Sequence, residues 1–141
     1  KKHENVLEVG TGSGYMAALL GVHADRVWSL EIDPQLAATA RENLRRAGVT
    51  NVTVEVGNGL AGLAAHAPYD VIMVSGAVAK VPQVLLDQLK PGGRLFAIEG
   101  AAPAMQAALY ARVGDAFRRV AVFETVVAPL TDAEPASAFA F

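Results

Sequence analysis

The amino-acid sequence predicts a doubly wound α/β fold: a mostly parallel, seven-stranded sheet with helices on both faces and an antiparallel strand from a C-terminal hairpin. Three observations lead to this prediction. Short apolar runs alternate with helix-like segments from residue 5 to residue 99. Some of these runs are nearly continuous in apolar residues, as inner parallel strands are. A glycine-rich segment joins the first predicted strand to the first predicted helix.

The first half of the chain contains three predicted strands and two predicted helices. We expect strands at residues 26–32 and 52–56, and a buried strand at 5–9 that glycines end. Helices are expected at residues 15–22 and 34–47. Asp33 can accept hydrogen bonds from the first-turn amides of the second helix, Pro34 suits its first position, and Gly48 ends it.

The second half continues this alternation and then changes. Residues 70–75 predict an inner strand, 82–89 a helix closed by Lys-Pro-Gly-Gly, and 94–99 another strand. Residues 105–113 and 117–127 flank Gly114-Asp115, which indicates a hairpin. Alanine is frequent in residues 105–113, so a helix is the alternative there.

Composition limits the class of protein. The 141 residues suit one domain, 1–141, and their hydrophobic share of 52% allows a real core. The net charge of −2 gives no electrostatic basis for binding nucleic acid. Without cysteine, disulfides, thiolate catalysis and cysteine-ligated zinc are excluded. His3, His23 and His66 have no metal-ligand spacing, so we expect no metal site.

The same features bear on location. No apolar run approaches the roughly 20 residues that span a bilayer, and no signal peptide is recognisable. We therefore expect a cytoplasmic monomer that does not enter membranes. The first predicted strand begins close to Lys1, so we also expect the sequence to be part of a longer protein.

The glycine-rich segment predicts a nucleotide-like ligand. It consists of Glu8, Val9, Gly10, Thr11, Gly12, Ser13 and Gly14. Glycines allow a tight turn and a close approach of ligand to backbone, and the helix N-terminus that follows favours polar groups. A dinucleotide fingerprint has glycines at positions one, three and six, but here the sixth position is Tyr15. An acidic residue two places before G-x-G-x-G is typical of methyltransferases that use S-adenosylmethionine. An ordinary glycine-rich turn is the alternative.

Two further segments complete the candidate cofactor site. Glu31, followed by Ile32, ends the second predicted strand, where a carboxylate can accept hydrogen bonds from ribose hydroxyls. Asp33 is the rival residue, although its place before Pro34 suggests helix capping. Asn58, with Gly59 and Leu60, follows the third strand and is a candidate for adenine contact. The alternative for Asn58 is a plain turn between glycines.

Several blocks in this order resemble the protein-L-isoaspartate O-methyltransferases. They are VLEVGTGSGYMAALL, ARENLRRAGVTNVTVEVGNG, APYDVIMVSGA and LLDQLKPGGRLF, with a late Pro129-Leu130-Thr131-Asp132. The resemblance implies a Rossmann-like methyltransferase fold and S-adenosylmethionine as methyl donor. It also implies repair of damaged proteins by methylation of the free α-carboxylate of isoaspartyl residues. A carboxylate is ionised at neutral pH, so we identify no catalytic acid or base and expect none to be needed.

The sequence also departs from the family pattern. The family's N-terminal segment before the glycine loop is not in this sequence. Residues 75–80 (SGAVAK) replace an alanine- and proline-rich loop, and Asn58 replaces an aspartate. Ser75 and Gly76, at the end of the fourth strand, are the candidates for contact with the methyl acceptor. Lys80 could attract a carboxylate, or be only a solvated surface lysine.

Three other functions fit the sequence less well. A methyltransferase of the same fold could act on a small molecule or RNA. The domain could bind S-adenosylmethionine without catalysis. An NAD-dependent dehydrogenase is the last alternative, and the early third glycine argues against it.

Overall fold

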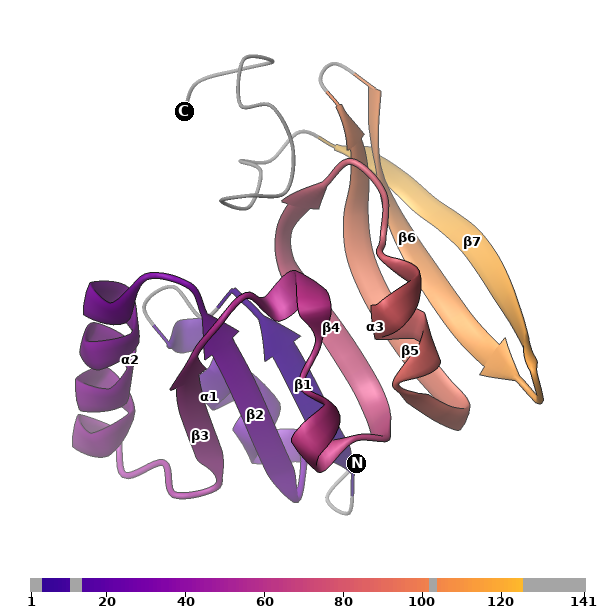
Figure 1. Cartoon of the computed structure of the whole chain (residues 1–141). Coiled ribbons are helices and arrows are strands. Elements are labelled where there is room, and N and C mark those ends of the chain that lie inside the picture. Colours follow the sequence, from indigo (N-terminus) through magenta and orange to yellow (C-terminus); the bar gives the residue numbers. More distant parts are fainter. Residues whose placement is uncertain (1–3, 11–13, 102–103, 126–141) are drawn as a thin grey trace.

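The computed structural model describes residues 4–10, 14–101 and 104–125. Its strands form one seven-stranded sheet in the order β3-β2-β1-β4-β5-β6-β7 (Figure 1). The elements are β1 (Asn5–Val9), α1 (Tyr15–His23), β2 (Arg26–Glu31), α2 (Pro34–Arg46), β3 (Val52–Val56), η1 (Gly59–Ala61), η2 (Ala64–His66), β4 (Tyr69–Val78), α3 (Gln83–Asp87), β5 (Leu89–Ala101), β6 (Ala104–Val113) and β7 (Ala116–Thr125).

The predicted fold class is confirmed. Strands β1 to β5 pair in parallel, whereas β6 pairs antiparallel with both β5 and β7. Strand β1 lies between β2 and β4, so successive connections leave it on one side and return on the other. This reversal is the topological switch point, outside which open α/β sheets bind ligands. The C-terminal hairpin supplies the antiparallel strand β6.

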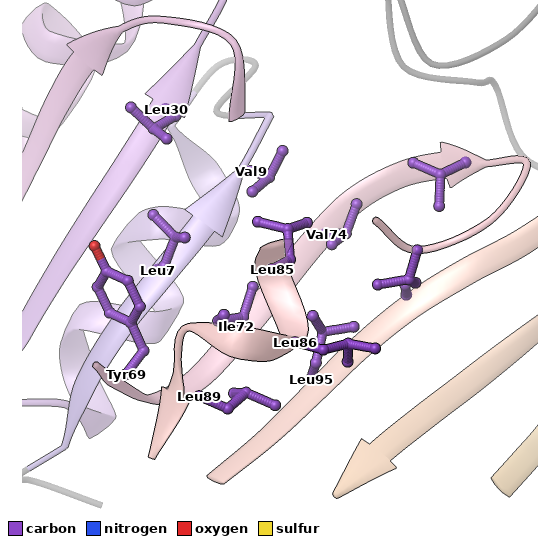
Figure 2. Packing of buried hydrophobic residues seen from close by; sticks show 13 residues of the cluster. Leu7, Val9, Leu30, Tyr69, Ile72, Val74, Leu85, Leu86, Leu89 and Leu95 are labelled. Atoms are coloured by element: carbon purple, nitrogen blue, oxygen red, sulfur yellow. The ribbon is translucent and has the colours of Figure 1, made fainter. Parts of the chain in front are cut away.

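Each face of the sheet is covered by its own apolar layer. Leu7 and Val9 of β1 belong to the largest cluster, which also contains Leu85 and Leu86 of α3 (Figure 2). Val6 packs on the opposite face with Ala24 and the chain around α1. Because side chains alternate along a strand, β1 is buried on both faces, as an inner parallel strand must be.

Helix α2 begins and ends at the predicted signals. Asp33 Oδ1 accepts hydrogen bonds from the amides of Gln35 at 2.8 Å and Leu36 at 3.3 Å. The helix ends at Arg46, and Gly48 follows with a φ of 74°, which a residue with a side chain rarely adopts. The sequence-based assignment of Asp33 as a cap is confirmed.

The predicted boundaries were wrong around α3. The predicted helix at residues 82–89 covers only Gln83–Asp87, because Leu89 already belongs to β5 and pairs with Tyr69. The next β5 partner is Arg94, opposite Val71, so residues 90–93 form an irregularity within the strand rather than a separate loop. Residues 104–113 form a strand, not the alternative helix, because β5 and β7 pair with both of its edges.

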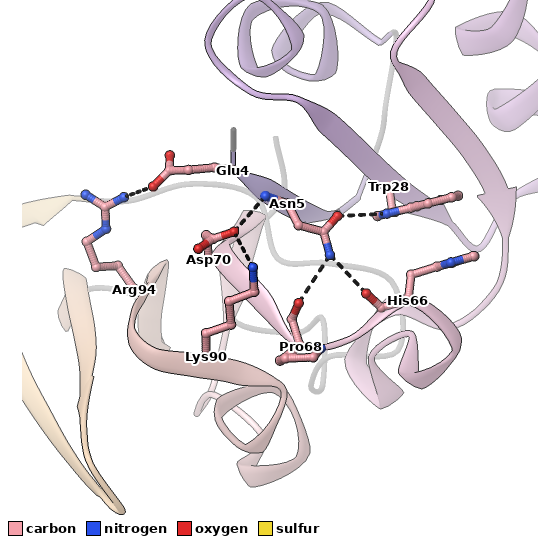
Figure 3. A network of polar contacts seen from close by, with 8 residues as sticks. All are labelled: Glu4, Asn5, Trp28, His66, Pro68, Asp70, Lys90 and Arg94. Atoms are coloured by element: carbon pink, nitrogen blue, oxygen red, sulfur yellow. Dashed lines mark hydrogen bonds and ion pairs between the residues drawn. The ribbon is translucent and has the colours of Figure 1, made fainter. Parts of the chain in front are cut away.

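A polar network joins the amino-terminal ends of the strands (Figure 3). Asn5 Nδ2 donates to the carbonyls of His66 at 2.9 Å and Pro68 at 3.2 Å, and its Oδ1 accepts from Trp28 Nε1 at 3.0 Å. Asp70 Oδ2 accepts from the Asn5 amide and from Lys90 Nζ, at 2.8 and 2.9 Å. These contacts hold η2 and the starts of β1, β4 and β5 together, at the edge opposite the glycine-rich segment.

The place of Trp28 at the centre of a strand predicts a core residue rather than a stacking platform. Trp28 does pack against the largest apolar cluster, where it is half-buried. Its indole also stacks on the imidazole of His66, with ring centroids 3.5 Å apart and planes within 2°. The prediction is therefore right for burial and incomplete for stacking, because η2 brings a distant ring onto the strand.

Candidate functional site

The candidate site lies at the carboxyl edge of the sheet, defined here as the segments that follow β1, β2, β3, β4 and β5. Backbone hydrogen bonds draw the first three together. The Gly10 amide donates to the Leu30 carbonyl at 2.8 Å, and the Gly57 amide donates to the Glu31 carbonyl at 3.0 Å. The segment after β1 thus rests on β2, and the segment after β3 rests on the last residue of β2.

Glycine is needed at three places in the segments that follow β1 and β3. Gly10 and Gly14 have φ values of 92° and 90°, which strain a residue with a side chain. Gly59 is buried, and a Cβ there would lie 2.4 Å from Val9 Cγ1. The turn after β3 therefore closes directly on the end of β1. Of the glycine-rich segment, Thr11, Gly12 and Ser13 lie outside the described residues.

Glu31 occupies the place expected of a ribose-binding carboxylate. It is the last residue of β2, is 7% exposed, and its Oε2 accepts from the Asp33 amide at 3.1 Å. This bond fixes the direction of the carboxylate at the edge, and half-buried Ile32 separates the two residues. Asp33, the rival candidate, is engaged as the cap of α2. The ribose role of Glu31 stays a prediction.

Asn58 forms a turn. Its Oδ1 accepts from the Leu60 amide at 3.0 Å and so caps the short helix η1. This bond supports the turn that was considered for Asn58, and its exposed amide still has donor and acceptor capacity toward a ligand. Leu60 is half-buried against the largest apolar cluster. Contact of Asn58 with adenine therefore stays a prediction.

Glu8 is the centre of a buried network that sequence reasoning missed. Its carboxylate is 0% exposed and accepts from Ser29 Oγ at 2.7 Å and Ser75 Oγ at 2.9 Å. Three neighbouring strands, β1, β2 and β4, are thereby joined across the switch point. The single serine in each of β2 and β4 was the available signal, but only the strand order shows that the two serines meet at Glu8.

Burial also changes the acidity of Glu8. Removal from water raises the pKa of its carboxyl from 4.5 to about 7, with a smaller contribution from the negative charge of Glu31. The hydrogen bonds from Ser29 and Ser75 oppose this rise, because they favour the charged form. Glu8, the first residue of the glycine-rich segment, therefore changes its charge near neutral pH.

The β4–β5 half of the edge, residues 75–81 with Glu99, contains the candidates for acceptor contact. Ser75 and Gly76 lie within β4, which continues to Val78. The Ser75 hydroxyl donates to Glu8, so it is directed toward the network described above. Lys80 is exposed just after the strand. Contact of Ser75 and Gly76 with a methyl acceptor is not tested by this geometry and stays a prediction.

Two negative findings apply to the described residues. Within residues 4–10, 14–101 and 104–125, no three histidine, aspartate or glutamate side chains are grouped so that they could hold a metal ion. None of the helices in this part of the chain combines the length and apolar character that crossing a bilayer requires. Residues 129–132 of the resemblance lie outside the described part.

Relatives with curated names share long segments with this chain. It is 54% identical over 100 residues to a protein-L-isoaspartate O-methyltransferase of Methanoculleus marisnigri, covering 71% of this chain and 46% of the relative. It is 39% identical over 133 residues to protein-L-isoaspartate O-methyltransferase 1 of a Polaromonas species, covering 94% of this chain and 56% of the relative. The chain thus spans about half the length of the curated relatives it matches.

Solved structures agree on the fold, and the family model covers nearly the whole chain. A protein-L-isoaspartate O-methyltransferase superposes with a TM-score of 0.82 and 30% identity, over 92% of this chain and 43% of that chain. The structure of a putative protein-L-isoaspartate O-methyltransferase from Plasmodium falciparum, in complex with S-adenosyl-L-homocysteine, superposes with a TM-score of 0.73 and 19% identity. The match covers 90% of this chain and 65% of that chain, and it supports the fold alone. The model for protein-L-isoaspartate(D-aspartate) O-methyltransferase matches residues 1–134. The chain therefore belongs to the protein-L-isoaspartate O-methyltransferase family.

Proposed function

We propose that the protein transfers a methyl group from S-adenosylmethionine to the free carboxylate of isoaspartyl residues in damaged proteins. Family membership over residues 1–134 is the observation that carries the proposal. The switch point between β1 and β4, with glycines at the ends of β1 and β3, supports the cofactor half of the proposal. The chain spans about half the length of the curated relatives it matches, so the activity of a whole protein is part of this proposal.

The described residues fit a nucleoside with a positively charged tail. Buried Gly59 packs against Val9, so the turn after β3 lies directly beside the end of β1 and brings two candidate cofactor segments together. The carboxylate of Glu31 suits paired ribose hydroxyls, and the Asn58 amide suits the polar edge of adenine. The carboxylate of Glu31 gives this part of the edge a negative charge, which favours a sulfonium cation over a dinucleotide pyrophosphate.

S-Adenosylmethionine, when bound, supplies an electrophilic methyl group on a sulfonium. The transfer needs no proton movement: a carboxylate oxygen forms the new bond to carbon, and the electrons of the sulfur–carbon bond return to sulfur. The products are a methyl ester and a neutral thioether. The chain then contributes mainly by aligning the two reactants. Alignment can lower the activation barrier by several kcal/mol, about 7–11 in favourable intramolecular reactions.

The acceptor would lie over the β4–β5 half of the edge. Cofactor candidates occupy the segments after β1, β2 and β3, so the segments after β4 and β5 remain on the far side of the switch point. We assign this half to the isoaspartyl side chain, with Ser75, Gly76 and Lys80 as candidate neighbours. The single-domain organisation, the monomeric state, the lack of nucleic-acid partners and the cytoplasmic location stay predictions of the sequence.

The test is methyl transfer by the full-length protein from radiolabelled S-adenosylmethionine. A synthetic peptide with one isoaspartyl residue is the acceptor, and the same peptide with normal aspartate is the control. The proposal expects labelling of the first alone, released by mild base as a methyl ester is. Labelling of neither peptide by a protein that binds the cofactor would point to a small-molecule or RNA acceptor, or to binding without catalysis.

A further inference from the structure

A second buried carboxylate lies in the β4–β5 half of the carboxyl edge. Glu99 of β5 is 7% exposed. Its Oε2 accepts from the Val81 amide at 2.9 Å and from Tyr110 Oη at 2.6 Å, and its Oε1 accepts from Arg119 Nε at 2.9 Å. One carboxylate thus joins β5, β6, β7 and the segment that leaves β4.

The network keeps Glu99 charged. Burial by itself would raise the pKa of the Glu99 carboxyl, but the hydrogen bonds from Tyr110, Val81 and Arg119 hold it below its ordinary value of 4.5. Desolvation, together with the hydrogen bond to Glu99 and its negative charge, raises the pKa of Tyr110 to about 12, and Arg119 opposes this rise. An ion pair that buries its carboxylate adds little net stability, because the cost of removing that charge from water offsets much of the attraction. The arrangement is therefore better explained by the geometry it fixes than by stability.

The geometry that Glu99 fixes is that of the segment after β4. The amide of Val81 is bound to Glu99, while its side chain is buried at 3% exposure in the largest apolar cluster. These two attachments fix the backbone immediately after Lys80, which is exposed. Glu99 thus limits the positions that the Lys80 ammonium can reach.

The charges of this half of the edge suit an anionic acceptor. Glu99 is balanced by Arg119, which is itself 39% exposed, and Lys80 adds a further positive charge. Exposed positive charge beside a reaction site attracts a carboxylate and raises its local concentration. The cofactor half, with the carboxylate of Glu31, has the opposite sign.

We propose that Glu99 is a positioning residue for the acceptor: it holds the segment after β4 so that Lys80 attracts the isoaspartyl carboxylate. The proposal rests on the function proposed above and names residues of the same site. It also gives the hairpin β6–β7 a role in the reaction, because Tyr110 and Arg119 hold Glu99 in place.

The test uses the full-length protein with Glu99→Gln and Lys80→Met. Glutamine keeps the shape of the side chain but replaces one acceptor oxygen with an amide group. That group then faces the hydrogen-bond donors that bind Glu99. We expect the KM for an isoaspartyl peptide to rise roughly threefold to tenfold in each variant, because the exposed charge of Lys80 is lost in one variant and misplaced in the other. The dissociation constant for S-adenosylhomocysteine should stay within about twofold, and Lys80→Arg should restore the KM. Glu99→Gln should also speed hydrogen exchange at the Val81 amide.

Matched controls separate position from general damage. Glu42→Gln removes a carboxylate that pairs with Arg45 and Arg46 on α2, and Lys90→Met removes a lysine at the opposite edge. Both should leave the KM unchanged.

An unchanged KM in Glu99→Gln, or unchanged exchange at Val81, would overturn the positioning role. An unchanged KM in Lys80→Met would overturn the role of Lys80. If the parent protein binds the cofactor but methylates no isoaspartyl peptide, the proposed function fails and the acceptor assignment with it. Hydrogen exchange at the Val81 amide then still shows whether Glu99 holds the segment after β4.

Discussion

Replacing Glu8 with glutamine should make the protein more stable at alkaline pH and change its stability little at pH 5. The carboxyl of Glu8 is fully buried and its pKa is raised to about 7 in the folded protein. In the unfolded chain the value is the ordinary 4.5. Between these values the folded state binds more protons than the unfolded state, so the free energy of unfolding falls as pH rises through this range.

The size of the effect follows from the two pKa values. A rise from 4.5 to about 7 corresponds to about 3 kcal/mol, of which about 2–3 kcal/mol is lost between pH 5 and pH 8. Above pH 8 no further loss is expected, because Glu8 is ionised in both states. Glutamine cannot ionise, and the hydroxyls of Ser29 and Ser75 can reorient to accept from its amide.

The assay is urea denaturation of the parent and Glu8→Gln proteins at several pH values from 5 to 8. The quantity of interest is the difference in free energy of unfolding between the two proteins, since contributions from other titrating groups cancel in it. This difference should move in favour of Glu8→Gln by about 2–3 kcal/mol across the range. Glu42→Gln, at an exposed carboxylate, serves as the control and should show no such gain.

A difference that stays constant across the pH range would contradict this reasoning. It would mean that Glu8 is ionised throughout, and that its contacts with the two serines offset the cost of burial. Ser29→Ala tests the same point from the other side, because loss of its hydrogen bond should raise the pKa of Glu8 further.

Three further substitutions test the site and its frame. Glu31→Ala should weaken binding of S-adenosylhomocysteine by roughly 1–3 kcal/mol, as for a lost charge-assisted hydrogen bond, and an unchanged dissociation constant in calorimetry would remove Glu31 from the site. Gly59→Ala should destabilise the fold by about 1–3 kcal/mol, since its Cβ would lie 2.4 Å from Val9 Cγ1, and Val9→Ala should relieve much of that cost in thermal unfolding. Asn5→Ala removes the side-chain bonds to His66, Pro68 and Trp28, and should speed hydrogen exchange in η2; exchange that stays slow would show that stacking on Trp28 holds η2 without Asn5.

The sequence was sufficient to predict the fold because its local signals agree with one another. The capping residue Asp33, the stop at Gly48 and the apolar runs of the inner strands each depend on a few neighbouring residues. The boundaries of α3 and β5 could not be predicted in the same way. Leu89 is in a strand because Tyr69, twenty positions earlier, pairs with it, and no local pattern reports that pairing.

The candidate site was predictable in part for the same reason. The glycines and Glu31 follow strands directly, so their common edge follows from the parallel order. The networks around Glu8 and Glu99 depend on which strands are neighbours. Ser75 meets Glu8 because β4 lies beside β1, and Arg119 meets Glu99 because the hairpin turns back onto β5. Contacts across 67 and 20 positions arise from topology alone.

The most direct test of the account is calorimetric titration of the full-length protein with S-adenosylhomocysteine, with NAD as the control ligand. We expect binding of S-adenosylhomocysteine alone, and weaker binding when Glu31 is replaced by alanine. Binding of NAD, or of neither ligand by a protein shown to be folded, would contradict the assignment of the carboxyl edge to the methyl donor.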